Sequence, residues 1–374
     1  MLNLIKELHF YFQLMILRFG KICQRKVIFA LIAVIILIRI WHGNMPIEEK
    51  HLSSDSKFPV QVGQKDGTKE IEILISKIEN AHVLDESGTY HVITDIFAEE
   101  GKSDTVLEND ITIVSQTSSN HLDEILNLTE RWGGPISIAV FTHDTDFKST
   151  IQHLVFLQLC LRRNGNQVHF HLIYPLISTP STEELNSFLN LEINCNIVMH
   201  TSSQLNYEIK GTEYPHNLLR NTAVKFCKTK YVLVIDIDML PNEHLRRDFR
   251  EFVVHSDLHQ YKFSVFVVPS FEFVYKNYTE IPMDRQKLLQ QWRLKNIRPF
   301  YYEVCWKCQK PTDYDKWKFL PETSSLDVSY FVEWKDPWEP FYIAEKNFPL
   351  YDERFKQYGF NRISQVYLFI LPFR

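Results

Sequence analysis

Along the chain, apolar runs typical of buried strands alternate with stretches whose apolar positions recur at helical spacing, regularly so from Leu122 onward. The pattern predicts helices over Leu122–Arg131, Ile151–Arg163, Thr182–Leu189, Leu218–Lys228, Leu245–Val254 and Asp284–Lys295. It predicts strands over Ile136–Thr142, Val168–Tyr174, Asn196–Met199, Val232–Ile235 and Phe263–Val268. Strands and helices that alternate at these spacings indicate βαβ units. The predicted fold class is therefore α/β, with a mostly parallel sheet flanked by helices.

The stretch Tyr231–Pro241 combines a buried strand with two acidic residues. Its aliphatic run, Val232–Ile235, is typical of a strand buried on both faces, and Asp236 and Asp238 follow where the run ends. Carboxylates that stop a buried strand are costly unless they are paired or bind a metal, and two of them can converge on one hard cation. Because open α/β sheets bind ligands outside the carboxyl ends of their strands, the pattern predicts a metal site there.

The acidic pair has two other interpretations. An Asp-x-Asp triplet occurs by chance in many chains, but here Pro241 stops the strand, Asn242 can cap a helix, and Leu245–Val254 follows at helical spacing. The phosphatase type of Asp-x-Asp site, with an aspartyl nucleophile, needs Thr or Val at the position that Leu240 occupies. The order of strand, acidic turn and helix therefore favours the metal site.

An apolar run near the N-terminus predicts a membrane segment. Val27–Ile38 is unbroken apolar sequence that extends to Trp41 and follows a cluster of Lys and Arg residues. A cleaved signal peptide would need a small-x-small site after the run, and a buried core helix would not be flanked by cationic and polar segments. We therefore predict a transmembrane signal anchor at residues 27–41 and a cytosolic tail at residues 1–26. The remainder is luminal because the positive charge lies on the N-terminal side.

Behind the anchor, residues 42–115 mix Ser, Asp, Lys and Gly with brief apolar runs, which predicts a partly ordered luminal stem. Residues 116–374 are expected to form the folded domain. After Pro269 the regular alternation fades and the sequence becomes dense in Trp, Tyr, Phe and Pro. Such a segment forms either an aromatic-rich lid over a pocket or ordinary core, and the pattern leaves both open.

Composition narrows the class of protein. The 374 residues are 45% hydrophobic and 14% aromatic, as in globular proteins, and the net charge of −5 provides no basic field for nucleic acid. Cys23 lies beside the predicted anchor, and the five other cysteines leave at least one unpaired or paired between chains. Cys305 and Cys308 have no second pair or His at zinc-finger spacing, so a disulfide or two separate thiols are expected rather than zinc. Asn127 and Asn277 begin Asn-x-Thr triplets, which are compatible with a luminal domain.

Seven short motifs follow one another between residues 132 and 362. They are Trp132–Ser137, Tyr214–Asn221, Val234–Asp238 with Leu240 and Pro241, Val267–Glu272, Pro311–Tyr314 with Trp317, Trp338–Phe341, and Pro349–Phe355 with Tyr358–Arg362. In these motifs the chain resembles glycosyltransferase family 49, the LARGE-type and β-1,4-glucuronyltransferase-type enzymes. The resemblance covers roughly residues 130–365 and implies a GT-A-type, Rossmann-like fold, a UDP-sugar donor, a divalent metal, usually Mn²⁺, and type II topology in the Golgi membrane. The expected nucleotide half is about 130–270 and the acceptor half about 271–374.

The resemblance also implies roles for particular residues. Asp238 would be the direct metal ligand, and Asp236 would hold the ribose and the metal shell. Arg220 and Asn221 would support the nucleotide pocket, although an ordinary cation on a helix surface is the alternative for Arg220.

The family inverts the anomeric carbon, which requires a carboxylate base within reach of the acceptor hydroxyl. Glu339 and Asp352 are the first candidates for this catalytic role, and Glu272 is another. Each of the three has an alternative role as a structural acid that pairs with Arg or Lys.

The expected function is that of a metal-dependent inverting glycosyltransferase, which moves glucuronic acid or a related sugar from a UDP-sugar to a glycan acceptor on a glycoprotein in the Golgi. A homodimer is compatible with this, and a nucleic-acid partner is not expected. The family carries a later strand and a His-x-Pro-type segment whose His is a third metal ligand, whereas Val366–Arg374 contains no His. A shortened chain, a site completed by other groups, and a catalytically silent glycan-binding or chaperone-like relative all stay open. Without that strand, Tyr367–Leu371 is expected to be an exposed, aggregation-prone edge.

Overall fold

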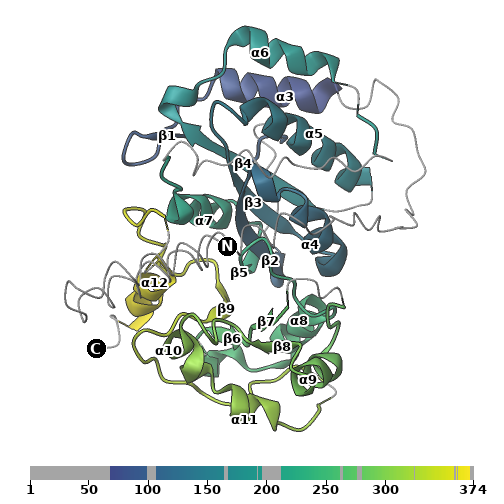
Figure 1. The fold of residues 1–374 in the computed structure, drawn as a ribbon, viewed down its shortest axis with the longest axis vertical. Coiled ribbons are helices and arrows are strands. Elements are labelled where there is room, and N and C mark those ends of the chain that lie inside the picture. Colours follow the sequence, from purple (N-terminus) through teal and green to yellow (C-terminus); the bar gives the residue numbers. More distant parts are fainter. Residues whose placement is uncertain are drawn as a thin grey trace, which may run out of the picture. The chain divides into compact units, whose positions relative to one another are not determined.

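Figure 1 shows the computed structural model of the chain. It describes residues 68–98, 107–163, 167–191, 193–195, 212–261, 264–275, 280–323, 325–357, 359 and 361–370. The chain divides into two units after Lys57, and every described residue belongs to the second, Phe58–Arg374. The predicted anchor at residues 27–41 lies outside the described residues and stays a prediction. Among the helices of the described ranges, none combines the length and the apolar character that crossing a membrane requires.

A seven-stranded sheet forms the centre of the second unit, and its strands lie in the order β1-β4-β3-β2-β5-β9-β6. The strands are β1 (Tyr90–Ile93), β2 (Leu107–Ser118), β3 (Ile136–Phe141), β4 (Val168–Pro175), β5 (Thr229–Val234), β6 (Phe266–Val268) and β9 (Phe341–Glu345), and a separate pair consists of β7 (Phe271–Phe273) and β8 (Ile297–Pro299). β4, β3, β2 and β5 are parallel neighbours, whereas β1, β9 and β6 pair antiparallel. A mixed α/β fold with a mostly parallel central sheet is thus confirmed.

Helices cover both faces of this sheet. The helices of the described residues are α3 (Thr68–Glu79), α4 (Glu124–Trp132), α5 (Phe147–Arg163), α6 (Thr182–Ser187), α7 (His216–Lys225), α8 (Leu245–His255), α9 (Arg285–Arg293), α10 (Trp306–Gln309), α11 (Tyr314–Lys318) and α12 (Asn361–Ile370). Successive strand residues point to opposite faces, so Leu233 of β5 packs in the apolar cluster that includes α3, α4, α5 and α8, and Val232 packs in the one that includes α7 and Val366 of α12. Figure 1 shows α7 on one side of the sheet and α4 and α5 on the other.

The predicted boundary between stem and folded domain at residue 116 is wrong. α3, β1 and β2 all come from the range expected to be a spacer, and β2 lies between β3 and β5 in the middle of the sheet. Ile113 of β2 is completely buried. The second half of β2 carries polar side chains, and these are buried with partners: the Ser115 hydroxyl donates to the carbonyl oxygen of Ile235 at 3.0 Å. The folded unit therefore includes β2 and the helix that precedes it.

Between Leu122 and Lys295 the predicted helices and strands are present, apart from Asn196–Met199, which lies outside the described residues. The largest shift is at α5, which begins at Phe147 rather than at Ile151. Asp146 explains this earlier start because its carbonyl oxygen accepts a hydrogen bond from the amide of Thr150 at 2.8 Å, which adds a turn before the apolar positions begin.

The exposed strand edge predicted over Tyr367–Leu371 is also wrong, because residues up to Ile370 belong to the helix α12. Its Gln365 is completely buried: the side chain accepts a hydrogen bond from the Tyr342 hydroxyl and donates one to the carbonyl oxygen of Pro349 at 3.1 Å. Val366 of the same helix is buried in the apolar cluster that contains Val232 of β5, whereas Tyr367 is 40% exposed.

Two disulfides and one free thiol account for the described cysteines. Cys160 pairs with Cys195, and Cys305 pairs with Cys308, which confirms the expectation of a disulfide rather than zinc. Cys227 is the unpaired cysteine that the odd number required, and it is buried.

Candidate functional site

The chain changes direction across the sheet beside β2. From β2 it proceeds to β3 and β4 on one side, and β5 then pairs with β2 on the other side. Open α/β sheets bind ligands at such a switch point, outside the carboxyl ends of the strands. The amide of Ile235 donates to the carbonyl oxygen of Val114 at 3.0 Å, so the contact with β2 continues up to Asp236. The acidic pair therefore lies at the switch point.

Asp236 is held by two buried arginines. Its Oδ1 lies 3.3 Å from Nη2 of Arg220 on α7, and its Oδ2 lies 2.6 Å from Nη2 of Arg362 on α12. The arginine side chains are 6% and 11% exposed, and that of Asp236 is 30% exposed. Burial by itself raises the pKa of Asp236, but the guanidinium groups of Arg362 and Arg220 outweigh it and lower the pKa. Asp236 is thus a fixed, ionised carboxylate.

Aromatic rings lie against both arginines. The guanidinium carbon of Arg362 is 3.9 Å from the ring centroid of Phe341, and that of Arg220 is 5.4 Å from the centroid of Tyr351. Such cation–π contacts stabilise a guanidinium that has lost water. The charge of Arg220 also acts on His216. Burial, followed by that charge, lowers the pKa of His216 to about 3. His216 is therefore neutral, and its Nδ1 is buried without a hydrogen-bond partner among the described residues.

Asp238 differs from Asp236 in its surroundings. Its side chain is exposed in the turn that follows the strand. Partial desolvation of the carboxylate, followed by the negative charge of Asp236, raises the pKa of Asp238. In the described part of the chain, no group of three or more His, Cys, Asp or Glu side chains could hold a metal ion. The acidic pair thus consists of one carboxylate fixed by arginines and one that faces solvent.

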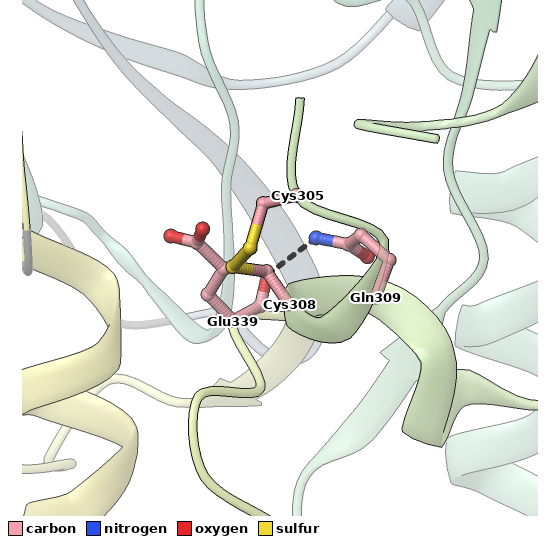
Figure 2. Close-up of a disulfide and its surroundings, with 4 residues drawn as sticks. All are labelled: Cys305, Cys308, Gln309 and Glu339. Carbon is pink, nitrogen blue, oxygen red and sulfur yellow. Dashed lines mark hydrogen bonds between the residues drawn. A yellow bond between two sulfur atoms is a disulfide. The ribbon is translucent and has the colours of Figure 1, made fainter. Parts of the chain in front are cut away.

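Glu339 is bound through its backbone to the segment that carries the second disulfide. Its amide donates to the carbonyl oxygen of Cys308 at 2.9 Å, and Nε2 of Gln309 donates to the Glu339 carbonyl oxygen at 2.9 Å (Figure 2). Figure 2 shows the carboxylate of Glu339 pointing away from Gln309. Burial, aided by Asp236, raises the pKa of Glu339, and the positive charge of Arg362 opposes the shift. Glu339 therefore lies within the electrostatic influence of the Asp236 group.

The other two acids proposed as bases are engaged by arginine. Asp352 accepts hydrogen bonds from Nε of Arg354 at 2.9 Å and from Nη2 at 2.6 Å, and these lower the pKa of Asp352. Glu272 accepts one from Nε of Arg298 at 2.6 Å and one from the amide of Tyr301 at 3.1 Å. Both carboxylates thus have the structural partners that the sequence allowed as an alternative.

Asn221 lies on α7 beside Arg220 and is completely enclosed. Its Nδ2 donates to the carbonyl oxygen of Tyr351 and to Oε1 of Glu353, each at 2.8 Å, and its Oδ1 accepts from the amide of Tyr351 at 2.9 Å. Both the nitrogen and the oxygen of the side-chain amide are therefore hydrogen-bonded. Asn221 thus fixes the segment Tyr351–Glu353 against α7 beside Arg220.

Sequence reasoning gave no role to Arg362 or His216, although both stand in the quoted motifs. The available signal for Arg362 was its place as a basic residue in the Tyr358–Arg362 motif, directly before Ile363. Its partner, however, lies on a turn far away in the chain. Only the packing of α12 beside β5 and β9 brings the two charges together.

Known proteins resemble this chain over most of the described unit. Residues 110–372 match the family described as "Glycosyl-transferase for dystroglycan". Beta-1,4-glucuronyltransferase 1 of Mus musculus is 36% identical over 303 residues, which is 78% of this chain and 70% of that protein. The protein of the same name from Danio rerio is 32% identical over 375 residues, covering 94% and 86%. Xylosyl- and glucuronyltransferase LARGE2s of Gallus gallus is 28% identical over 258 residues, covering 69% and 29%.

Proposed function

Because the chain belongs to the family of glycosyl-transferases for dystroglycan, and is thus a glycosyltransferase, we propose that it transfers glucuronic acid from UDP-glucuronic acid to a glycan acceptor. Glucuronyl transfer is named in the relatives of both types, which supports this donor. The observation that carries the proposal is the position of Asp236 and Asp238 at the switch point, with Arg220 and Arg362 on Asp236. The sheet is proposed to be of the GT-A type, with the donor at this edge.

The acidic pair fits a divalent cation such as Mn²⁺. Asp236 is ionised and fixed, whereas Asp238 is exposed and carries a raised pKa that a nearby cation would reverse. Asp238 is therefore the proposed direct ligand, and Asp236 supports it. When bound, the cation offsets the charge that develops on the diphosphate of the leaving UDP. Arg220 and Arg362 keep Asp236 in its charged form before the cation and the UDP-sugar bind.

Glu339 is the proposed general base. Its raised pKa brings the carboxylate closer to the operating pH, where a base that must accept and release a proton is most effective. It takes the proton of the acceptor hydroxyl while that oxygen bonds to the anomeric carbon and the bond from this carbon to UDP breaks. Attack from the face opposite UDP inverts the carbon. The hydrogen bonds to Cys308 and Gln309 hold the Glu339 backbone for this step.

We further propose that this domain lies in the Golgi lumen behind a signal anchor at residues 27–41. The pairs Cys160–Cys195 and Cys305–Cys308 support a secretory location, since disulfides persist in oxidising compartments and are rare in the cytosol.

Release of UDP from UDP-glucuronic acid, with and without Mn²⁺, tests the function. Asp238→Asn is nearly isosteric but removes a charge, so it should lower UDP release by about 100-fold at unchanged melting temperature. Asp315→Asn, at an exposed position of α11, is the matched control and should behave as the wild type. Full turnover by Asp238→Asn at saturating Mn²⁺ would show that the acidic pair is structural. A wild-type chain that releases no UDP would instead favour a catalytically silent glycan-binding protein.

A further inference from the structure

Tyr301 adopts a backbone conformation that a tyrosine rarely takes. Its φ is +57°, in the left-handed region, where the Cβ atom crowds the following carbonyl group. Residues other than glycine remain there only when their surroundings over-determine the conformation, and such residues cluster at functional sites. The contacts of Tyr301 therefore need an explanation.

Hydrogen bonds hold Tyr301 on both sides of its Cα atom. Its amide donates to Oε2 of Glu272 at 3.1 Å, and Glu272 is itself held by Nε of Arg298 at 2.6 Å. Its carbonyl oxygen accepts from the amide of Cys305 at 2.9 Å. Tyr301 is thus fixed in a turn that leads from β8 to the second disulfide.

A row of rings connects Tyr301 to the Asp236 group. The ring of Tyr301 stacks on that of Phe300 with centroids 4.1 Å apart and planes at 18°, and Phe300 meets Phe341 at 5.4 Å. Phe341 lies 3.9 Å beneath the guanidinium carbon of Arg362. Burial by itself lowers the pKa of Arg362, but Asp236, then Tyr351 and, after it, Tyr301 raise it. The Tyr301 side chain therefore lies on the Arg362 side of the site.

The same turn also positions Glu339. The amide of Cys305 donates to the Tyr301 carbonyl oxygen, and the disulfide joins Cys305 to Cys308 (Figure 2). The carbonyl oxygen of Cys308 in turn accepts a hydrogen bond from the Glu339 amide at 2.9 Å. A general base lies beside the hydroxyl from which it takes the proton. The backbones of Tyr301 and Glu339 are thus linked through one short turn.

We propose that Tyr301 binds the terminal pyranose ring of the acceptor, with its ring against the sugar and its phenol oxygen hydrogen-bonded to a sugar hydroxyl. A tyrosine combines an apolar body with a polar tip, which matches a sugar with C–H faces and hydroxyl edges. The inference rests on the proposed function, because Glu339 as the base defines where the acceptor lies. The strained backbone is then what directs this side chain into the site.

Tyr301→Phe, which removes only the phenol oxygen, tests the proposal. Initial rates are measured from UDP-glucuronic acid to the best acceptor of a panel of p-nitrophenyl pyranosides, beside UDP release without acceptor. The KM for the acceptor should rise at least about fivefold, as expected for one lost hydrogen bond, while acceptor-free UDP release stays unchanged. Lys295→Gly is the matched control: Lys295 also has a positive φ, +62°, and is exposed at the end of α9, so its variant should keep the wild-type KM.

An acceptor KM within twofold of the wild type in Tyr301→Phe overturns the inference. A parallel loss of acceptor-free UDP release overturns it as well, because it assigns Tyr301 to the donor. Failure of the proposed function has a different signature, since the wild-type chain itself then releases no UDP or transfers to no acceptor, and the inference falls with it.

Discussion

Replacing Arg362 by Met should measure how much the buried ion pair with Asp236 contributes to stability. Breaking a buried pair by removing one partner typically costs about 3–5 kcal/mol, because the other charge stays buried without compensation. Here the Asp236 side chain is 30% exposed and Arg220 remains 3.3 Å away, so part of the cost is offset. We expect the free energy of unfolding to fall by about 2–3 kcal/mol.

A double-mutant cycle separates the pair from the packing of the arginine on Phe341. Arg362→Met, Asp236→Asn and the double variant are compared by urea unfolding, followed by tryptophan fluorescence. The losses in free energy of unfolding of the two single variants, added together, should exceed the loss of the double variant by about 1–3 kcal/mol, as expected for charged side chains in direct contact. Arg354→Met is the control: its side chain is 90% exposed and its pair with Asp352 lies at the surface, so its unfolding curve should overlay that of the wild type.

A coupling energy below about 0.5 kcal/mol would refute the reasoning. It would mean that Arg220 and water suffice to hold Asp236 in its charged form. The contact of Arg362 with the ring of Phe341 would then account for its burial.

Two further predictions concern pH and the choice of base. His171 is completely buried, and burial lowers its pKa to about 3, whereas a histidine in the unfolded chain has a pKa near 6.5. Between these two pH values the unfolded state binds one more proton than the folded state. The free energy of unfolding therefore falls as the pH drops below about 6.5. Between pH 7 and pH 5 the free energy of unfolding should fall by about 2 kcal/mol more in the wild type than in His171→Asn, and equal slopes in the two proteins would contradict this. Glu339→Gln should lower transfer at least about 100-fold, whereas Asp352→Asn should stay within about threefold because Arg354 already engages that carboxylate; the reverse order in rate assays would assign the base to Asp352.

Local signals explain which parts of the fold could be predicted. β5 was predictable because an aliphatic run that ends in two acids needs no distant information, and α8 because its apolar positions repeat at helical spacing. β2 was not, since Ser115 and Gln116 suggest an exposed segment until their partners on the β5 turn and at Tyr214 are known. The Tyr367–Leu371 run likewise fits a strand and a helix equally well over so few residues.

The candidate site likewise has a part that the sequence predicts and a part that it does not. Asp236 and Asp238 carry their chemistry in their spacing, so the sequence alone predicts them. Their setting does not follow, because Arg362 reaches Asp236 only through the packing of α12, and Glu339 is distinguished from Asp352 only by which charges surround it. Motifs identify the acids, and the tertiary structure decides which of them are engaged elsewhere.

Cys227 bears on the order of events while the chain matures. In the finished fold this thiol is 4% exposed, its sulfur donates to the carbonyl oxygen of Ala223 at 3.3 Å, and burial raises its pKa to about 12. Disulfide exchange proceeds through the thiolate, so Cys227 cannot attack either disulfide once the fold is complete. A nascent chain has no such shield, and every thiol competes for every other. Burial of Cys227 beside α7 and β5 therefore removes this thiol from the competition and favours the pairs Cys160–Cys195 and Cys305–Cys308.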